Sequence, residues 1–209
     1  AVKKQFPSAR VLRMDADTTK EKESYERILS QFANEKADIL IGTQMIVKGH
    51  DFPKVTLVGI LAADLSLNVS DYRSAERTFQ LLAQAAGRAG RGEHAGEVLI
   101  QTYQPEHYSI VSAANQDYRG FFSQELAYWE LLNYPPKAHI LAVLCIGKKE
   151  EENEECLSIL AGKAKERVMN IDRQNTGKLS VIGPAPAGLS KANDLYRNLV
   201  YFKSVSYGI

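Results

Sequence analysis

Two largely apolar runs, at residues 37–41 and 55–63, constrain the fold of this chain more than any other feature. Apolar and polar residues do not alternate along them, so each run predicts a strand that is buried on both faces. Such strands are typical of parallel sheets covered by helices. Another apolar run at 11–14 precedes them, and a fourth at 97–103 follows.

Helical patterns fill the segments between these strands. Residues 21–34 carry apolar side chains at the i, i+3, i+4, i+7 spacing of one buried helix face: Tyr25, Ile28, Leu29 and Phe32. A loop at 64–71 leads into a second helix expected at 72–86. The order strand, helix, strand, strand, helix, strand predicts an α/β lobe built on a parallel sheet.

Two glycine-bearing segments stand at the ends of these elements. The first, Gly-Thr-Gln-Met-Ile-Val-Lys-Gly-His-Asp-Phe-Pro at 42–53, follows a strand and presents small and polar residues where open α/β sheets bind ligands. The second, Gln-Ala-Ala-Gly-Arg-Ala-Gly-Arg at 84–91, closes a helix. Its Arg88 and Arg91 share one face if the turn stays helical. Two guanidinium forks on one face suit a triphosphate.

Each segment also has a purely structural explanation. Arg88 and Arg91 could be solvated side chains at an ordinary helix C-terminus, and the glycine, aspartate and proline of the first segment suit a plain turn. The occurrence of both segments, in order and each after an apolar element, favours a functional pair. His50 and His94 lie near them, but a loop histidine is more often solvated or hydrogen-bonded than a general base.

The two segments resemble motifs V and VI of superfamily-2 helicases. The likeness is more specific still, because it continues through Val-Thr-Leu-Val-Gly-Ile-Leu-Ala-Ala-Asp, Asp-Tyr-Arg-Ser-Ala-Glu-Arg-Thr-Phe-Gln-Leu-Leu, Leu-Asn-Tyr-Pro-Pro and Val-Ile-Gly-Pro-Ala-Pro-Ala. These stretches resemble the replication-restart DNA helicases, the primosomal protein N-prime family. The resemblance covers nearly the whole chain and is strongest from Asp15 to Tyr103.

The resemblance implies an ATP-dependent helicase that moves 3′ to 5′ on single-stranded DNA, restarts stalled replication forks and loads the primosome. Residues 1–104 would be its second RecA-like lobe. The catalytic residues implied are Arg91 as arginine finger on the γ-phosphate, with Arg88 and Gln84 beside it. The other implied site residues are Gly49 and Asp51 near the nucleotide, and Thr43 and Lys48 on the DNA backbone.

The implied cofactor is ATP with Mg²⁺. The sequence holds no G-x-x-x-x-G-K-[ST] stretch, so we expect the phosphate cradle and the metal site to lie mostly in the other lobe, outside this chain. In the resembled family that lobe, a DNA-binding domain and a cysteine-rich zinc insertion come earlier. Zinc is therefore expected only in that insertion, and no metal site is expected among these residues.

After residue 104 the pattern changes, and residues 105–209 predict a smaller α+β domain that is expected to be truncated at its end. The elements expected here are a helix at 107–133, a strand at 139–146, a helix from the acidic run at 150–155 to 168, a strand at 179–182, a turn at 183–186 and a strand at 199–205. Aromatic residues of the long helix could stack on bases, but their helical spacing favours core packing: Tyr118, Phe121, Phe122, Tyr128 and Trp129.

Composition sets the remaining expectations. A net charge of +1 gives no global basic field, so DNA contact must come from local patches. Cys145 and Cys156 are too few for a zinc site, and Cys145 lies in an apolar run that predicts a reduced, buried thiol. Asp15 and Asp17 fit cap and loop roles better than metal binding.

Partners and location follow from the resemblance and the composition. Expected partners are single-stranded and forked DNA, single-stranded DNA-binding protein and other primosome proteins. A membrane is not expected, because no run approaches the length of a membrane span, and a cytoplasmic protein is expected. Two other classes stay open: a DNA- or protein-binding module without enzymatic activity, and a nucleotide-binding switch unrelated to DNA.

Overall fold

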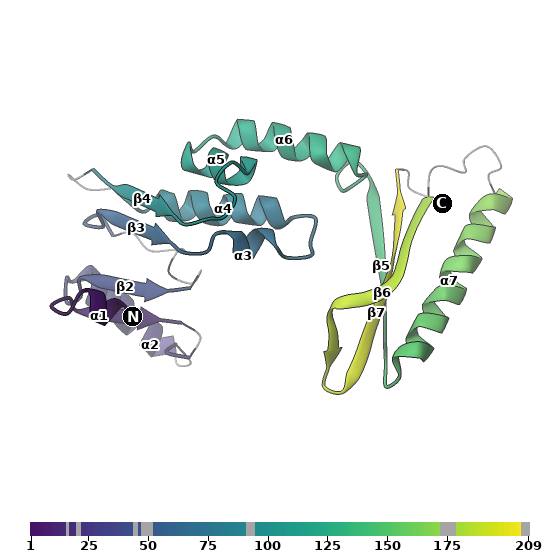
Figure 1. Cartoon of the computed structure of the whole chain (residues 1–209), viewed down its shortest axis with the longest axis horizontal. Coiled ribbons are helices and arrows are strands. Elements are labelled where there is room, and N and C mark those ends of the chain that lie inside the picture. The colour runs from purple at the N-terminus through teal and green to yellow at the C-terminus, as the bar shows by residue number, and fades with distance from the viewer. Residues whose placement is uncertain are drawn as a thin grey trace. The chain divides into compact units, whose positions relative to one another are not determined.

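The computed structural model describes residues 1–15, 17–19, 22–43, 46, 52–90, 95–171 and 179–205 (Figure 1). It divides into two compact units, residues 1–121 and residues 122–209. The first unit extends beyond residue 104 because helix α5 (Tyr108–Ala114) packs on helix α4 (Ser74–Ala86). The boundary that we place from the sequence between residues 104 and 105 stays a prediction.

The first unit begins with a short helix α1 (Val2–Gln5) and a two-stranded parallel sheet, in which β1 (Val11–Met14) pairs with β2 (Ile39–Gly42). Helix α2 (Lys22–Ala33) packs on β1. The expected apolar face of this helix forms the core: Ile28 and Leu29 are buried with Met14, and Tyr25 packs against them. The expected strand at 11–14 is confirmed to the residue.

A second parallel pair lies further along the unit, where β3 (Leu57–Ile60) pairs with β4 (Glu97–Ile100). Helix α4 packs against β3. A one-turn helix α3 (Asp64–Leu67) occupies part of the segment that we expected to be a loop. Both strands are shorter than their apolar runs at 55–63 and 97–103.

The expectation of strands buried on both faces is wrong for β2, where Ile41 is 37% exposed, and for β3, whose partner β4 is exposed in the same way. The residues of β3 and β4 alternate between exposed and half-buried, and Leu57 and Leu99 are 56% and 54% exposed. Ile60 and Ile100 point to the other face, where they pack against the core beneath the helices. Among the described residues the strands form two separate pairs, so the structure has small parallel sheets in place of the single sheet that we expected.

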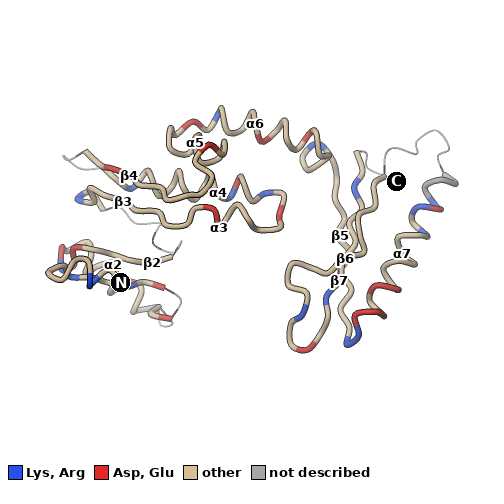
Figure 2. The backbone as a smooth tube through the Cα atoms, viewed as in Figure 1, with Lys and Arg blue, Asp and Glu red and all other residues tan. Residues whose placement is uncertain are grey.

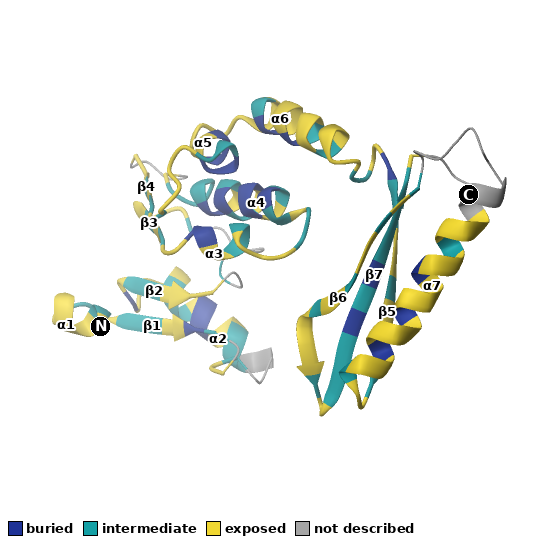
Figure 3. Cartoon of the chain, turned by 45° about the vertical axis from the view of Figure 1, so that its right-hand side comes forward, coloured by how far each residue is buried: buried dark blue, intermediate teal, exposed yellow. Residues whose placement is uncertain are grey.

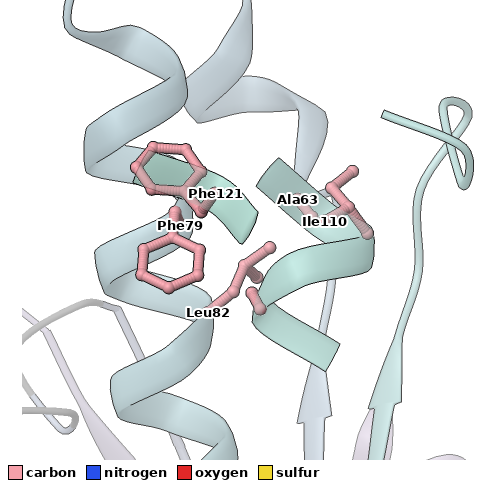
Figure 4. Close-up of a cluster of buried hydrophobic side chains, with 6 residues drawn as sticks. Ala63, Phe79, Leu82, Ile110 and Phe121 are labelled. Carbon is pink, nitrogen blue, oxygen red and sulfur yellow. The ribbon is translucent and has the colours of Figure 1, made fainter. Parts of the chain in front are cut away.

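Aromatic stacking holds the helical layer of this unit together. The rings of Phe79 on α4 and Phe121 on helix α6 (Tyr118–Leu131) lie 4.2 Å apart with an interplanar angle of 8°. Leu82, Ile110, Ala63 and Ala113 complete the cluster (Figure 4). Such a stacked pair contributes about 0.5–1.5 kcal/mol beyond the area it buries.

The single helix expected at 107–133 is wrong, because the chain breaks between α5 and α6. Gln116 has a φ of 54°, in the left-handed region that does not continue a right-handed helix. Of the five aromatic side chains expected in the core, only Phe121 is buried. The others are exposed or half-buried, with Tyr118, Phe122 and Tyr128 in the exposed class.

The second unit is an antiparallel sheet in the order β5 (His139–Gly147), β7 (Leu195–Ser204), β6 (Leu179–Ala192), with helix α7 (Glu150–Ile171) against it (Figure 3). Leu157 and Ala161 of α7 pack on Val200 at the centre of the sheet. Strand β5 and helix α7 confirm the expected elements at 139–146 and 150–168.

The turn expected at 183–186 is wrong. Strand β6 continues through it, and the register shifts between Ile182 and Ala185, where Gly183 takes a φ of 103°. Prolines interrupt a strand least when it lies at the sheet edge, which is the position of β6.

Charge is distributed unevenly along α7 (Figure 2). Glu150, Glu151 and Glu152 fill its first turn, as expected from the acidic run, and Lys163, Lys165 and Arg167 lie in its second half. The glutamates oppose the positive charge at the amino end of the helix dipole and stabilise the first turn.

Candidate nucleotide and DNA site

The first glycine-bearing segment leaves the carboxyl end of β2 through a tightly packed turn. A Cβ placed on Gly42 would lie 2.5 Å from the Met14 carbonyl oxygen and 2.7 Å from Cγ2 of Ile46. The Ile46 amide donates to the Thr43 carbonyl at 3.2 Å, which folds the chain back over Gly42. Thr43 is thereby placed, exposed, directly after the strand.

The same segment is anchored again at its far end. The ring of Phe52 packs edge-on against Phe32 of α2, with centroids 5.0 Å apart. Two residues later, Lys54 forms an ion pair with Glu35. Ile46 and Phe52 both contact the core around Met14. Lys48, Gly49 and Asp51, together with His50, lie outside the described residues.

The second segment continues the path of α4 for three residues. Beyond Ala86, the amides of Gly87, Arg88 and Ala89 donate to carbonyls three or four residues back, at 3.0, 3.0 and 3.3 Å. Gln84 and Arg88 are therefore one turn apart on the same side of the helix. Gln84 is exposed and Arg88 half-buried.

The helical path ends at Gly90, which has a φ of 73°. Our expectation that Arg88 and Arg91 share a face depended on a continuing helical turn, and the backbone of Gly90 itself departs from helical geometry. Arg91 itself, like His94, lies outside the described residues. The shared face of the two arginines therefore stays a prediction.

The backbones of Gly90 and Gly96 lie in close contact. A Cβ on Gly90 would lie 2.6 Å from the Gly96 nitrogen, and a Cβ on Gly96 would lie 2.1 Å from the Gly90 nitrogen. Only glycine fits at either position without backbone movement. The sequence carried no sign that Gly96 belongs to the site, because its contact is made in space.

Backbone hydrogen bonds join the two segments at the amino ends of β3 and β4. The Gly90 amide donates to the Val55 carbonyl at 3.1 Å, two residues after the first segment ends at Pro53. The Glu97 amide donates to the Thr56 carbonyl at 2.8 Å. The first segment starts at the carboxyl end of β2, as expected. The second segment approaches it at the amino ends of β3 and β4.

Asp64, which the sequence pattern did not indicate, lies at the carboxyl ends of β3 and β4. Asp64 is 6% exposed, accepts from the Thr102 hydroxyl at 2.7 Å and accepts from the Tyr103 amide at 2.9 Å. The Thr102 hydroxyl and the Tyr103 amide lower the pKa of Asp64. Its lone pairs are used within the fold, which gives it a structural role.

Asp15 is confirmed in a loop role. It accepts from the Thr18 amide at 3.0 Å, and its own amide donates to the Thr18 hydroxyl at 2.8 Å.

Within the described ranges, His, Cys, Asp and Glu side chains form no group of three or more suited to a metal. The helices described are also all too short or too polar to cross a membrane.

Comparison with known proteins adds an independent line of evidence. The family model described as "Helicase conserved C-terminal domain" matches residues 2–93, which include both glycine-bearing segments.

Similar proteins match over nearly the whole chain. The "Replication restart protein PriA" of Synechocystis is 42% identical over 207 residues, 99% of this chain and 24% of that protein. The protein of the same name from Bacillus subtilis is 46% identical over 195 residues, 93% of this chain and 23% of that protein. This chain thus spans about a quarter of the length of these relatives.

Proposed function

We infer that this chain belongs to the replication restart helicases, and from that premise we propose that it supplies the second, arginine-bearing ATPase lobe and the following domain of an ATP-dependent DNA helicase. The helicase moves 3′ to 5′ on single-stranded DNA, restarts stalled forks and loads the primosome. The lobe is RecA-like and faces a nucleotide held mainly by the other lobe.

The observation that supports the proposal most directly is the bond from the Gly90 amide to the Val55 carbonyl. It joins Gly90 of the second motif to Val55, two residues beyond the first motif, through backbone atoms with no flexible side chain between them. In the proposed enzyme, the second motif senses the nucleotide, whereas the first touches DNA through Thr43 and Lys48 and approaches the nucleotide through Gly49 and Asp51. A backbone connection of this kind suits a machine in which ATP hydrolysis moves a strand.

The chemistry assigned to the second motif is charge neutralisation. As the γ-phosphoryl group leaves ATP, negative charge builds on its oxygens and on the leaving group. Arg91 enters this site when the lobes close, with Arg88 and Gln84 beside it and with Gly49 and Asp51 approaching the nucleotide. A guanidinium fork reaches two phosphate oxygens, which a lysine ammonium cannot do with the same geometry.

The first motif is assigned to the DNA strand. Thr43 is exposed at the end of β2, where its hydroxyl can donate to a phosphate oxygen. Lys48 adds one cationic contact to the backbone. Contacts of this kind hold a strand without reading its sequence.

The remaining components are assigned outside this chain. ATP arrives with Mg²⁺, and the first lobe holds most of both; zinc belongs to an insertion elsewhere in the whole protein. Partners are single-stranded and forked DNA, single-stranded DNA-binding protein and other primosome proteins, and the protein works in the cytoplasm.

The decisive experiment changes Arg91 in the intact protein. Arg91→Ala is expected to lower DNA-stimulated ATP turnover about 10³-fold or more, the range of arginine fingers, because the charge that it neutralises develops only in the transition state. DNA affinity should stay nearly unchanged, and Arg91→Lys should restore little of the turnover. The measurements are steady-state ATPase activity and DNA-binding titration.

A matched control is available on helix α4, which leads into the second motif. Arg77 forms a surface ion pair with Asp71, and its side chain is 54% exposed. Arg77→Ala should keep normal turnover. If folded Arg91→Ala enzyme keeps more than about a tenth of the activity, the arginine only ends a helix, since one tenfold step is about 1.4 kcal/mol of barrier.

The alternative is a DNA- or protein-binding module without enzymatic activity. It predicts that the intact protein binds DNA with no DNA-stimulated ATP turnover at any nucleotide concentration. A nucleotide switch unrelated to DNA predicts turnover that DNA does not change. The same ATPase assay with and without single-stranded DNA separates the three.

A further inference from the structure

The fold places the two cysteines of the chain on a strand and a helix that pack against each other, although eleven positions separate them in the sequence. Cys145 lies on β5 and packs against the core formed by Leu157, Ala161 and Val200. Its thiol donates to the Asn153 side-chain oxygen, with Sγ and Oδ1 3.5 Å apart. The face of β5 that carries Cys145 is therefore covered by α7.

Cys156 lies on that same part of α7. It follows Asn153 by three residues, about one helical turn, so the two side chains project from one side of the helix. It also directly precedes Leu157, which is 1% exposed. Burial raises the pKa of the Cys145 thiol, and the neighbouring Cys156 thiol raises it further.

The surroundings of the two thiols differ in a way that sets an order of reaction. Cys156 is exposed, whereas Cys145 is half-buried. A small oxidant in solution reaches Cys156 first. Thiolates are the attacking species in thiol–disulfide exchange, so the raised pKa of Cys145 also makes it the slower group toward an external reagent.

We propose that Cys145 and Cys156 are an oxidative modification site, at which a low-molecular-weight disulfide such as oxidised glutathione converts the thiol pair into a disulfide between β5 and α7. The Cys156 thiolate attacks the small disulfide, forms a mixed disulfide and releases one small thiol. The Cys145 thiol then attacks Sγ of Cys156 and expels the second. Two protein thiols are oxidised to one disulfide, and one small disulfide is reduced to two thiols.

Oxidation costs one internal hydrogen bond, because the Cys145 S–H that donates to Asn153 is lost. Asn153 stays fixed by other contacts, since its amide donates to the Tyr196 carbonyl at 3.1 Å and to the Asn198 side-chain oxygen at 3.4 Å. The new bond fastens the helix to the sheet beside this buried amide pair. The proposal is independent of the ATPase assignment, because none of these residues belongs to the two motifs.

The test uses the 209-residue chain treated with oxidised glutathione, followed by alkylation of free thiols and digestion with trypsin. Cleavage after Lys137, Lys148, Lys149 and Lys163 puts the cysteines on separate peptides, residues 138–148 and 150–163. Mass spectrometry is expected to find these two peptides joined, with a loss of about 2 Da for the two hydrogen atoms. Pairing should be ~tenfold or more faster in the folded chain than in denaturant, because the fold holds the thiols together.

Variants separate the steps. Cys145→Ser should accumulate the glutathione adduct on Cys156, and Cys156→Ser should leave Cys145 unmodified in the folded chain. The proposal is overturned if the natural chain keeps a stable adduct on Cys156 beside a free Cys145, if the 150–163 peptide joins its own copy from a second chain, or if neither thiol reacts. Equal pairing rates in folded and denatured chain would also overturn it.

Discussion

At the scale of single residues, the pair Gly90 and Gly96 shows how a motif is held by atoms outside it. Neither glycine offers a side chain, yet their backbones approach so closely that any Cβ would collide. Gly90 lies inside the recognised segment and was singled out with it. Gly96 lies beyond, and nothing in the sequence order indicates that it faces Gly90.

Gly96→Ala is expected to lower the free energy of unfolding by about 1–3 kcal/mol, the usual cost of forcing extra atoms into a packed region. Gly59→Ala is the matched control in the neighbouring strand, since a Cβ at Gly59 meets no atom within 4 Å. It should change stability by less than about 0.5 kcal/mol. Thermal unfolding of the two variants measures the difference; equal midpoints would contradict the close approach.

At the scale of elements, the Arg10–Asp38 pair joins the segments that lead into β1 and β2. The Arg10 backbone amide and the guanidinium Nε both donate to Oδ2 of Asp38, at 2.8 and 3.0 Å. The Arg10 guanidinium lowers the pKa of Asp38 from 3.8 to about 2. The pair is largely exposed, so water and salt weaken it.

This pair predicts a small acid sensitivity. Because the folded pKa of Asp38 is lower than its usual value, the stabilisation is fully present above about pH 4 and is lost as the pH falls toward 2. Asp38→Asn should have a thermal midpoint that falls less between about pH 4 and pH 2 than that of the natural chain. Identical slopes in the two proteins would remove Asp38 as a contributor.

The sequence predicted elements well where periodicity alone decides them. Helix α2 lies where the apolar spacing placed it, β1 where a short apolar run placed it, and α7 where the acidic run placed its start. The sequence failed where tertiary contacts decide the structure. The helix break at Gln116 is marked by neither glycine nor proline. Strand β6 continues through two prolines because, at the edge of the sheet, their missing amide donors are not needed for pairing.

The candidate site divides in the same way. The sequence predicted the two segments and their positions after β2 and α4, since glycines and charged residues mark them. It could not predict that they meet through Gly90 and Val55, or that Asp64 closes the far end of the strands, because both depend on three-dimensional register. The roles of all the site residues stay predictions: Thr43, Lys48, Gly49, Asp51, Gln84, Arg88 and Arg91.

At the scale of the whole molecule, the first prediction concerns catalysis by this chain alone. It carries no G-x-x-x-x-G-K-[ST] stretch, the loop that binds the phosphates of ATP. The arginines of the second motif therefore have no phosphate-binding loop beside them in this chain. The purified chain should show no ATP turnover above a buffer blank, with or without single-stranded DNA. Turnover in a preparation that Arg91→Ala abolishes would contradict this, because contaminating ATPases do not respond to that change.

The second whole-molecule prediction concerns DNA. With a net charge of +1, attraction for a phosphate backbone comes only from local contacts, so single-stranded DNA should bind weakly and more weakly still as salt rises. Fluorescence anisotropy with a labelled oligonucleotide at two salt concentrations measures both. Tight binding that salt leaves unchanged would require a different, uncharged mode of recognition.

The bond between Gly90 and Val55 also has a mechanical consequence. A hydrogen bond between two backbone groups has no rotatable side chain in its path, and Glu97 and Thr56 add a second such bond beside it. A displacement of the second segment is therefore transmitted to the start of β3 through backbone atoms. In the helicase proposed above, these two bonds give a direct backbone connection between the second segment and the strand that follows the first.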